Sequence, residues 1–254
     1  MSQLLTLARD LKRRKARERK GLFVAEGVRT VEELVASKRA VTGALVSPVI
    51  HDTPRGIALF SALHAQGIET VEVSEKDFES AADTEHPQGV LAIAKAPTAT
   101  LAGLDLPDGT VRLLVLDGVQ DPGNAGTLVR TGAALGVFAV IALPGTADLW
   151  SAKAIRSAVG AHFRRPVLHA ELDELRSLLT DSKVELWATA GDGQPIDAQP
   201  APTRLAVAVG NEGAGVSDAL RGLAARSVAL PMSSGVESLN VAVAAGIALY
   251  ALRP

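Results

Sequence analysis

The 254-residue sequence contains no cysteine, and only 3% of its residues are aromatic. Without cysteine the chain has neither disulfide bonds nor thiolate metal ligands. With so few aromatic side chains, base stacking is not expected to dominate any binding of RNA. No apolar run reaches the roughly 18 residues that a membrane span needs, and the N-terminal residues lack the order of a signal peptide. We therefore expect a cytoplasmic protein with no membrane partner.

Several standard catalytic motifs are also missing from the sequence. The absence of G-x-x-x-x-G-K-[ST] excludes a Walker-type nucleotide site, and the absence of G-x-S-x-G disfavours an α/β-hydrolase. The order of glycines in "GNEGAG" is not the dinucleotide fingerprint, which disfavours a Rossmann dehydrogenase. The histidines lack zincin spacing, so we expect no catalytic metal and interpret each as a surface or satisfied side chain: His51, His64, His86, His162 and His169.

Positive charge is concentrated near the N-terminus. Residues 9–20, "RDLKRRKARERK", hold eight Lys or Arg and two acidic residues, whereas the whole chain has a net charge of -2. This asymmetry favours a nucleic acid partner over a membrane, because the segment lacks an aromatic or leucine-rich face. A helix surface that is merely solvated remains an equal alternative.

Short β-rich runs alternate with helical stretches along the chain, which predicts an α/β fold in two domains. A segment rich in Pro, Gly and Thr separates them. We expect a small N-terminal α/β domain at 1–97, a linker at 98–110 and a second domain at 111–254. The second domain contains continuous apolar strands, the pattern of a parallel sheet covered by helices.

The stretch "VGNEGAGVS", residues 209–217, places three glycines between a predicted strand and a helix that could begin at Ser217. Such loops often bind phosphate, but the Glu212 carboxylate would occupy the place of the anion. The stretch is therefore an ordinary turn, or it binds a ligand that is not a phosphate.

Other polar residues lie among turns and apolar elements. Asn124 and Arg130 fall in a helix predicted at 124–136, and Ser238 and Asn240 precede or open an apolar helix predicted at 238–252. Each has an ordinary alternative, with Asn124 and Ser238 as helix caps, Arg130 as a surface charge and Glu212 as a turn residue. The second helix is apolar almost all round, which predicts burial inside the domain or against a partner subunit.

Three segments together, "DGVQDPGNAGTLVRTGAALG", "VAVGNEGAGVS" and "LPMSSGVESLNVAVAAGIALY", resemble the signature motifs of the SpoU-type (TrmH-like) RNA ribose 2′-O-methyltransferases of the SPOUT superfamily. The segment 151–167 is similar to the region between the first two motifs, and the N-terminal third is similar to the small substrate-binding domain of that family. The resemblance implies a C-terminal SPOUT α/β domain with a deep trefoil knot, a homodimer, and an N-terminal RNA-binding domain.

The same resemblance implies that S-adenosylmethionine is the cofactor. It places cofactor contacts at Gly210, Leu230 and Leu239, with Met232 nearby. This cofactor has no phosphate and carries a sulfonium cation, so Glu212 is compatible with it. A catalytic role falls on Arg130, assisted by Asn124, Ser238 and Asn240, and Glu212 is a candidate base because of the pKa of a carboxyl group.

The expected reaction is methyl transfer to a ribose 2′-hydroxyl of RNA, with 23S ribosomal RNA favoured because the chain has a separate N-terminal domain. Transfer RNA is the second substrate candidate, and an RNA-binding module without catalysis is the alternative of another class. Because arginine has a pKa above about 12, we expect Arg130 to clamp an RNA phosphate and polarise the hydroxyl. A neighbouring phosphate or Glu212 would accept the proton.

Overall fold

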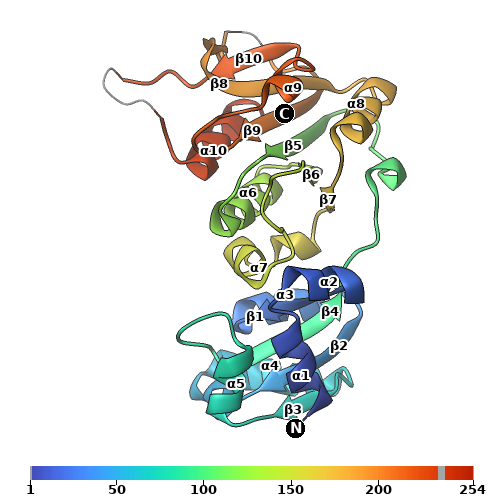
Figure 1. Ribbon diagram of the computed structural model, residues 1–254, viewed down its shortest axis with the longest axis vertical. Helices are drawn as coiled ribbons and strands as arrows, with labels where there is room; N and C mark the ends of the chain where they lie inside the picture. The colour runs from blue at the N-terminus through green and yellow to red at the C-terminus, as the bar shows by residue number, and fades with distance from the viewer. Residues whose placement is uncertain (1, 199, 234–237, 254) are drawn as a thin grey trace. The chain divides into compact units, whose positions relative to one another are not determined.

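The computed structural model of the chain describes residues 2–198, 200–233 and 238–253. These residues form two compact units, each with its own β-sheet (Figure 1). The first unit runs to Thr98 and also includes Trp150–Arg164, and the second consists of Ala99–Leu149 and the residues from Arg165 onward. The sequence predicts that the chain passes only once from the first domain to the second, within residues 98–110. In the structure, the later segment Trp150–Arg164 also belongs to the N-terminal unit.

The N-terminal unit is an α/β structure built on a four-stranded sheet of order β1-β4-β2-β3. Strand β4 is antiparallel to both of its neighbours, and β2 and β3 are parallel. The strands are β1 (Leu22–Glu26), β2 (Val41–Val46), β3 (Thr70–Glu72) and β4 (Val90–Lys95). The helices are α1 (Gln3–Asp10), α2 (Arg14–Lys20), α3 (Val28–Ala36), α4 (Pro54–Ala65) and α5 (Glu75–Ala81), with a 3-10 helix at Pro48–Asp52.

The later segment of this unit carries helix α7 (Ala152–Ala158) and a 3-10 helix at Ala161–Phe163. Its apolar side chains complete the core of the N-terminal unit. The Phe23 ring lies 5.0 Å from the Trp150 ring and 5.8 Å from the Phe163 ring, between centroids. Ile155 is fully buried in the same cluster. Burial of these large apolar surfaces explains why the segment packs here.

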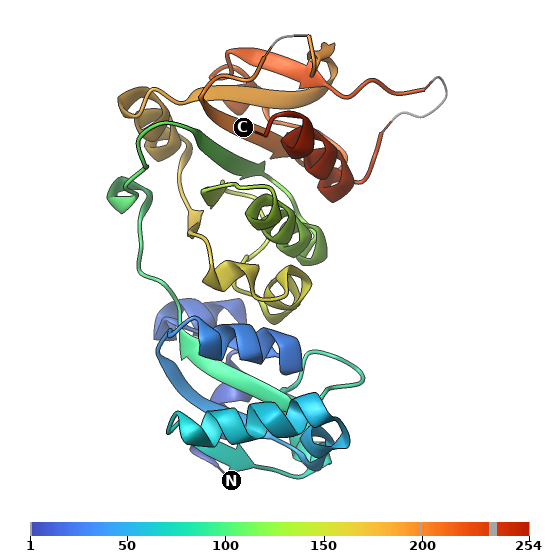
Figure 2. The same cartoon turned by 180° about the vertical axis from the view of Figure 1, so that it is seen from behind.

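The second unit contains a six-stranded sheet of order β10-β8-β9-β5-β6-β7, in which every adjacent pair is parallel. This confirms the predicted parallel sheet (Figure 2). Its strands are β5 (Val111–Asp117), β6 (Ala139–Ala142), β7 (Val167–His169), β8 (Glu185–Pro195), β9 (Arg204–Gly210) and β10 (Arg226–Ala229). Its helices are α6 (Pro122–Ala134), α8 (Leu172–Asp181), α9 (Asp218–Arg221) and α10 (Val241–Ala251), with a 3-10 helix at Leu101–Gly103.

The segment expected as a linker, residues 98–110, is packed against the second unit. Leu101 is only 2% exposed and belongs to the core that contains β5. The Arg204 guanidinium donates a hydrogen bond of 2.8 Å to the Pro107 carbonyl. Its high content of Pro and Gly therefore reflects irregular backbone rather than a lack of contacts.

The predicted starts of α6 and α10 were wrong. Helix α6 is capped by Asp121, whose Oδ1 accepts a 2.9 Å hydrogen bond from the backbone N–H of Asn124, and Pro122 occupies the first turn. Helix α10 is capped by Asn240 and not by Ser238. Asn124 and Ser238 therefore do not cap these helices, although the sequence had offered that alternative for both.

Helix α10 packs along α6 but is not buried on every side (Figures 1 and 2). Ala245 and Ala248 are fully buried, whereas Val243, Ile247 and Tyr250 are 51%, 47% and 58% exposed. The spacing of the exposed residues, four and then three apart, places them on one face of the helix. The prediction of burial inside the domain is therefore wrong for this face of the helix, and burial against a partner subunit stays a prediction. Among the described residues, no helix is long and apolar enough to cross a lipid bilayer.

Candidate active site

The carboxyl ends of β5 and β9 lie side by side at the centre of the second unit. These strands are parallel neighbours, and Asp117 at the end of β5 is paired with Gly210 at the end of β9. The loop that leads into α6 and the glycine-rich loop after β9 therefore emerge at the same edge of the sheet. This edge is where open parallel α/β sheets bind their ligands.

Three of the predicted site residues form a hydrogen-bonded chain at this edge. The Asn124 side-chain amide donates to Glu212 Oε1 at 3.0 Å, and the Asn240 amide donates to Asn124 Oδ1 at 3.0 Å. The backbone N–H of Gln120 donates to the other Glu212 oxygen at 3.3 Å. Each residue of the chain comes from a different one of the three motif segments. The fold thus joins parts of the sequence that are more than one hundred residues apart.

This arrangement keeps Glu212 ionised. Burial raises the pKa of the Glu212 carboxyl, but hydrogen bonds from Asn124 and from the backbone N–H groups of Glu212, Gln120 and Asp121 oppose that effect and hold the pKa below its ordinary value. A carboxylate that accepts several hydrogen bonds is stabilised in its charged form. Glu212 therefore presents a fixed negative charge at neutral pH.

Sequence reasoning missed the residues that hold the two loops together. The Asn211 side chain accepts hydrogen bonds from the backbone N–H of Gly213 at 2.9 Å and of Ala214 at 3.0 Å, and it donates to the Gly118 carbonyl at 3.0 Å. Asp117 Oδ2 accepts from the backbone N–H of Ser217 at 2.7 Å. The signal for Asn211 was present, because Asn before glycines favours a turn closed by its own side chain.

Gly210 is required by the shape of its own loop. A Cβ atom at this position would lie 2.0 Å from the Gly215 carbonyl carbon and 2.2 Å from the Val216 nitrogen. The loop folds back against the end of β9, where Asn211 and Gly215 exchange two backbone hydrogen bonds. Any side chain here would displace the loop that carries Glu212. This gives a reason for glycine that is independent of a bound ligand.

Two of the predicted catalytic residues do not join the hydrogen-bonded chain. Arg130 lies on α6, six residues beyond Asn124, and its side chain is exposed. Six residues correspond to about 600° of helix rotation, so Arg130 and Asn124 project from different faces. Within the described parts of the chain, the Arg130 guanidinium has no hydrogen bond or ion pair. Ser238 is also exposed, in the segment that precedes α10.

The residues predicted to contact the cofactor also lie beyond the carboxyl ends of strands. Leu230 follows β10 and is half-buried, and Met232 and Leu239 are each 38% exposed. The loops 118–121 and 210–217 contain two carboxylates, Asp121 and Glu212, and no Lys or Arg. A phosphate ligand would meet negative charge there, whereas a ligand that is cationic and partly apolar fits these residues. In the described chain, no group of three His, Cys, Asp or Glu side chains is arranged to hold a metal ion.

Comparisons with known proteins show the family of the chain. The chain matches the SpoU rRNA Methylase family over residues 112–250 and the MRM3-like substrate binding domain over residues 6–92. It is 38% identical over 247 residues to the 23S rRNA (guanosine(2553)-2'-O)-methyltransferase RlmP of Bacillus subtilis, with 96% of this chain and 94% of that protein covered. It is 32% identical to the 23S rRNA (guanosine-2'-O-)-methyltransferase RlmB of Escherichia coli, with 77% and 83% covered.

A solved structure is similar over nearly the whole chain. The AdoMet-bound rRNA methyltransferase from Sinorhizobium meliloti superimposes with a TM-score of 0.85 at 25% identity, and covers 99% of this chain and 94% of its own. The family match includes all three motif segments that build the Asn124, Glu212 and Asn240 chain. The protein therefore belongs to the SpoU rRNA methylase family.

Proposed function

We propose that this protein is a cytoplasmic methyltransferase that moves the methyl group of S-adenosylmethionine to a ribose 2′-hydroxyl of 23S ribosomal RNA. The observation that carries this proposal is the hydrogen-bonded chain of Asn124, Glu212 and Asn240, assembled from three family motifs at the carboxyl edge of the sheet. Its relatives of known name include methyltransferases that modify 23S rRNA.

The cofactor would supply a methyl group activated by a sulfonium cation. Backbone groups of the loop at Gly210, together with Leu230, Met232 and Leu239, would hold its adenosyl part by close approach and apolar contact. The fixed charge of Glu212 favours a cation at this edge of the sheet.

Arg130 is the residue that we assign to the RNA side of the reaction. Its guanidinium is exposed, so it is available to bind a phosphate of the substrate with two parallel hydrogen bonds. Bound in this way, it would place the 2′-hydroxyl in line with the methyl group and polarise it. The proton would leave for a neighbouring phosphate or for Glu212 as the new C–O bond forms, and Asn124, Ser238 and Asn240 would position these groups.

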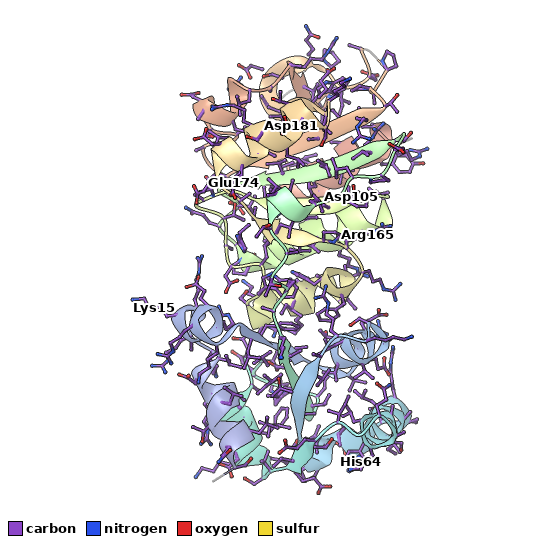
Figure 3. All side chains as sticks on the ribbon, turned by 90° about the vertical axis from the view of Figure 1, so that its right-hand side faces the viewer. Lys15, His64, Asp105, Arg165, Glu174 and Asp181 are labelled. Atoms are coloured by element: carbon purple, nitrogen blue, oxygen red, sulfur yellow. The ribbon has the colours of Figure 1, made fainter. Side chains whose placement is uncertain are left out.

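The basic segment 9–20 would contribute to RNA binding through only part of its charge. Arg17 is buried and donates to the Leu11 and Lys12 carbonyls, Lys12 donates to the Ala82 carbonyl, and Arg9 pairs with Asp77. These three cations stabilise the N-terminal unit. The other five cations are exposed, and four of them pair with acidic residues of the same segment: Arg13, Arg19 and Lys20 with Asp10, and Arg14 with Glu18. An RNA phosphate would replace these exposed pairs, and Lys15, the fifth cation, projects outward from α2 in Figure 3.

The exposed face of α10 supports a homodimer. Val243, Ile247 and Tyr250 form an apolar stripe on a helix whose opposite face is fully buried. A second copy of the chain, with its own α10 and the adjacent start of α6, would cover this stripe.

The proposal is tested with purified protein, labelled S-adenosylmethionine and separated 16S, 23S and transfer RNA. Label is expected in 23S rRNA. Label in transfer RNA alone would reassign the substrate, and RNA binding without any label would indicate a binding module that has lost catalysis.

A further inference from the structure

A second candidate site lies in the N-terminal unit, at the start of α3. It is a pocket of about 240 Å³ whose lining includes Glu26, Arg29, Thr30, His86, Gln88 and Arg156. All of these residues belong to the first unit, and Arg156 comes from its later segment, on α7. None of them takes part in the site described above.

The pocket offers hydrogen-bond donors that have no acceptor. Thr30 is 3% exposed, and its hydroxyl makes no hydrogen bond within the described parts of the chain. Arg29 is exposed, and among the described residues its guanidinium has no ion pair. The Gln88 carbonyl oxygen accepts from the backbone N–H of Val28 at 2.9 Å, so the amide group of this side chain remains as a donor. Unused donors beside a buried hydroxyl indicate an acceptor-rich ligand.

Arg156 adds positive charge at the wall of the pocket. Its Nη2 donates to Asp83 Oδ2 at 3.2 Å, while its Nη1 is buried, has no hydrogen bond and lies 3.7 Å from Glu26 Oε2. The Arg156 side chain is 31% exposed. Asp83 thus orients Nη2 of Arg156, and Nη1 can still donate a hydrogen bond to a ligand.

The Glu26 carboxylate could repel an anion, but its oxygens are already used. Glu26 is 2% exposed and accepts hydrogen bonds from the backbone N–H of Asp83 at 2.7 Å, from the backbone N–H of Thr84 at 3.3 Å, and from the Thr84 hydroxyl. These hydrogen-bond donors and the nearby Arg156 guanidinium stabilise the negative charge of Glu26. Glu26 therefore fixes the loop that forms one wall of the pocket and leaves the exposed Arg29 guanidinium and the buried Thr30 hydroxyl as donors for a ligand.

We infer that this pocket binds a backbone phosphate of the RNA substrate. The inference rests on the proposed function, which supplies the RNA, and it extends the substrate-contacting surface to a site outside the methyltransferase unit. A phosphodiester presents the charge and the acceptor oxygens that two arginines, a threonine hydroxyl and a carboxamide recognise. The backbone N–H groups of Arg29 and Thr30 in the first turn of α3 add donors of the same kind, whereas that of Val28 is bound by Gln88.

The test compares the binding of protein-free 23S rRNA by the full-length wild type and by three variants, without cofactor and over a range of salt concentrations. Arg29→Ala is expected to weaken binding about tenfold and to reduce the slope of log affinity against log salt by about one. Thr30→Val, which removes only the hydroxyl, should weaken binding about threefold. The control is Lys76→Ala, which removes an exposed cation at the same helix position of α5 and should leave both quantities unchanged.

Equal behaviour of Arg29→Ala and Lys76→Ala would overturn the inference, provided that both variants melt at the wild-type temperature. If Arg29→Ala does not fold, Arg29→Gln gives the same comparison with the side-chain volume retained. Thermal protection of the wild type by inorganic phosphate, with no loss of RNA affinity in Arg29→Ala, would assign the pocket to a free anion instead. Because binding is measured without turnover, the result is readable even if the wild type fails to methylate RNA, which would reject the proposed function alone.

Discussion

The Asn124 side chain links Glu212 to Asn240: it donates to Glu212 Oε1 at 3.0 Å and accepts from the Asn240 amide at 3.0 Å. Asn240 in turn caps α10, because its Oδ1 accepts a hydrogen bond of 2.9 Å from the backbone N–H of Ala242. Side-chain hydrogen bonds therefore connect the glycine-rich loop, the start of α6 and the start of α10. A shift of any one of them changes the position of the Glu212 carboxylate.

Glu212→Gln should make stability depend less on pH. Since the folded state holds the pKa of Glu212 below its ordinary value, the charged group contributes stability that is fully present above about pH 4.3, the usual Glu value. That contribution is lost as the pH falls through the lowered pKa. The wild type should therefore melt above Glu212→Gln at neutral pH, with a gap that closes in acid. Thermal melts of both proteins between neutral pH and acid check this, and a gap that widens on acidification would contradict it.

Arg130→Ala should lower turnover by about two to four orders of magnitude, the range for a group that acts on the transferred proton or its oxygen. Cofactor affinity and melting temperature should change little, because Arg130 is exposed on α6 and Ala favours a helix. Arg130→Lys should retain part of the rate while it loses the paired hydrogen bonds. Single-turnover kinetics and calorimetric titration separate these effects.

The matched control for Arg130 is Arg176→Ala, which removes an exposed arginine from α8 of the same unit. It should turn over at the wild-type rate. Wild-type turnover in Arg130→Ala would remove this residue from the mechanism and direct attention to Glu212.

Gly210→Ala should destabilise the protein by about 1–3 kcal/mol, the range for an added group in a packed site. The new Cβ would lie 2.0 Å from Gly215, so the loop must move. Gly213→Ala is the control, because a Cβ there would meet only Asn211 Oδ1, at 3.6 Å. Urea denaturation should show a large loss for the first variant and a small change for the second. Equal losses would show that the close approach of the loop does not require glycine at position 210.

Ile247→Arg should give a folded monomer if α10 forms a dimer interface, because Ile247 is 47% exposed in the single chain. Ala245→Arg places the same charge on the buried face of the helix and should impair folding itself. Light scattering of the wild type at micromolar concentration should give the mass of a dimer. A wild-type monomer under these conditions would contradict the proposal.

The sequence was sufficient for the fold class and for most elements, because the buried strands of the second unit are continuous apolar runs such as β5 and β9. It could not predict the short strands β7 and β10, which have three and four residues and too few positions for a pattern. It also could not show that residues 150–164 pack with the N-terminal unit, since that depends on tertiary contacts of Phe23 with Trp150 and Phe163. The knot remains a prediction from the family resemblance.

For the site, sequence reasoning selected Asn124, Glu212 and Asn240 individually, and the structure shows that they form one hydrogen-bonded chain. No local pattern relates positions that are 88 and 116 residues apart. The parallel pairing of β5 with β9 brings the first two together, and the packing of α10 on α6 adds the third. The pocket at α3 was missed for the same reason, because Arg29 and Arg156 are distant in sequence.

The most direct measurement is the chemical position of the transferred methyl group. Purified protein is incubated with 23S rRNA and S-adenosylmethionine labelled at the methyl group, and the RNA is digested to nucleosides for mass spectrometry. The label is expected on the ribose of a single nucleotide, which also makes the adjacent phosphodiester resistant to alkali, and Arg130→Ala should form this product at least about a hundred times more slowly. Label on a base, or no label in RNA from an active preparation that binds the cofactor, would contradict ribose 2′-O-methylation.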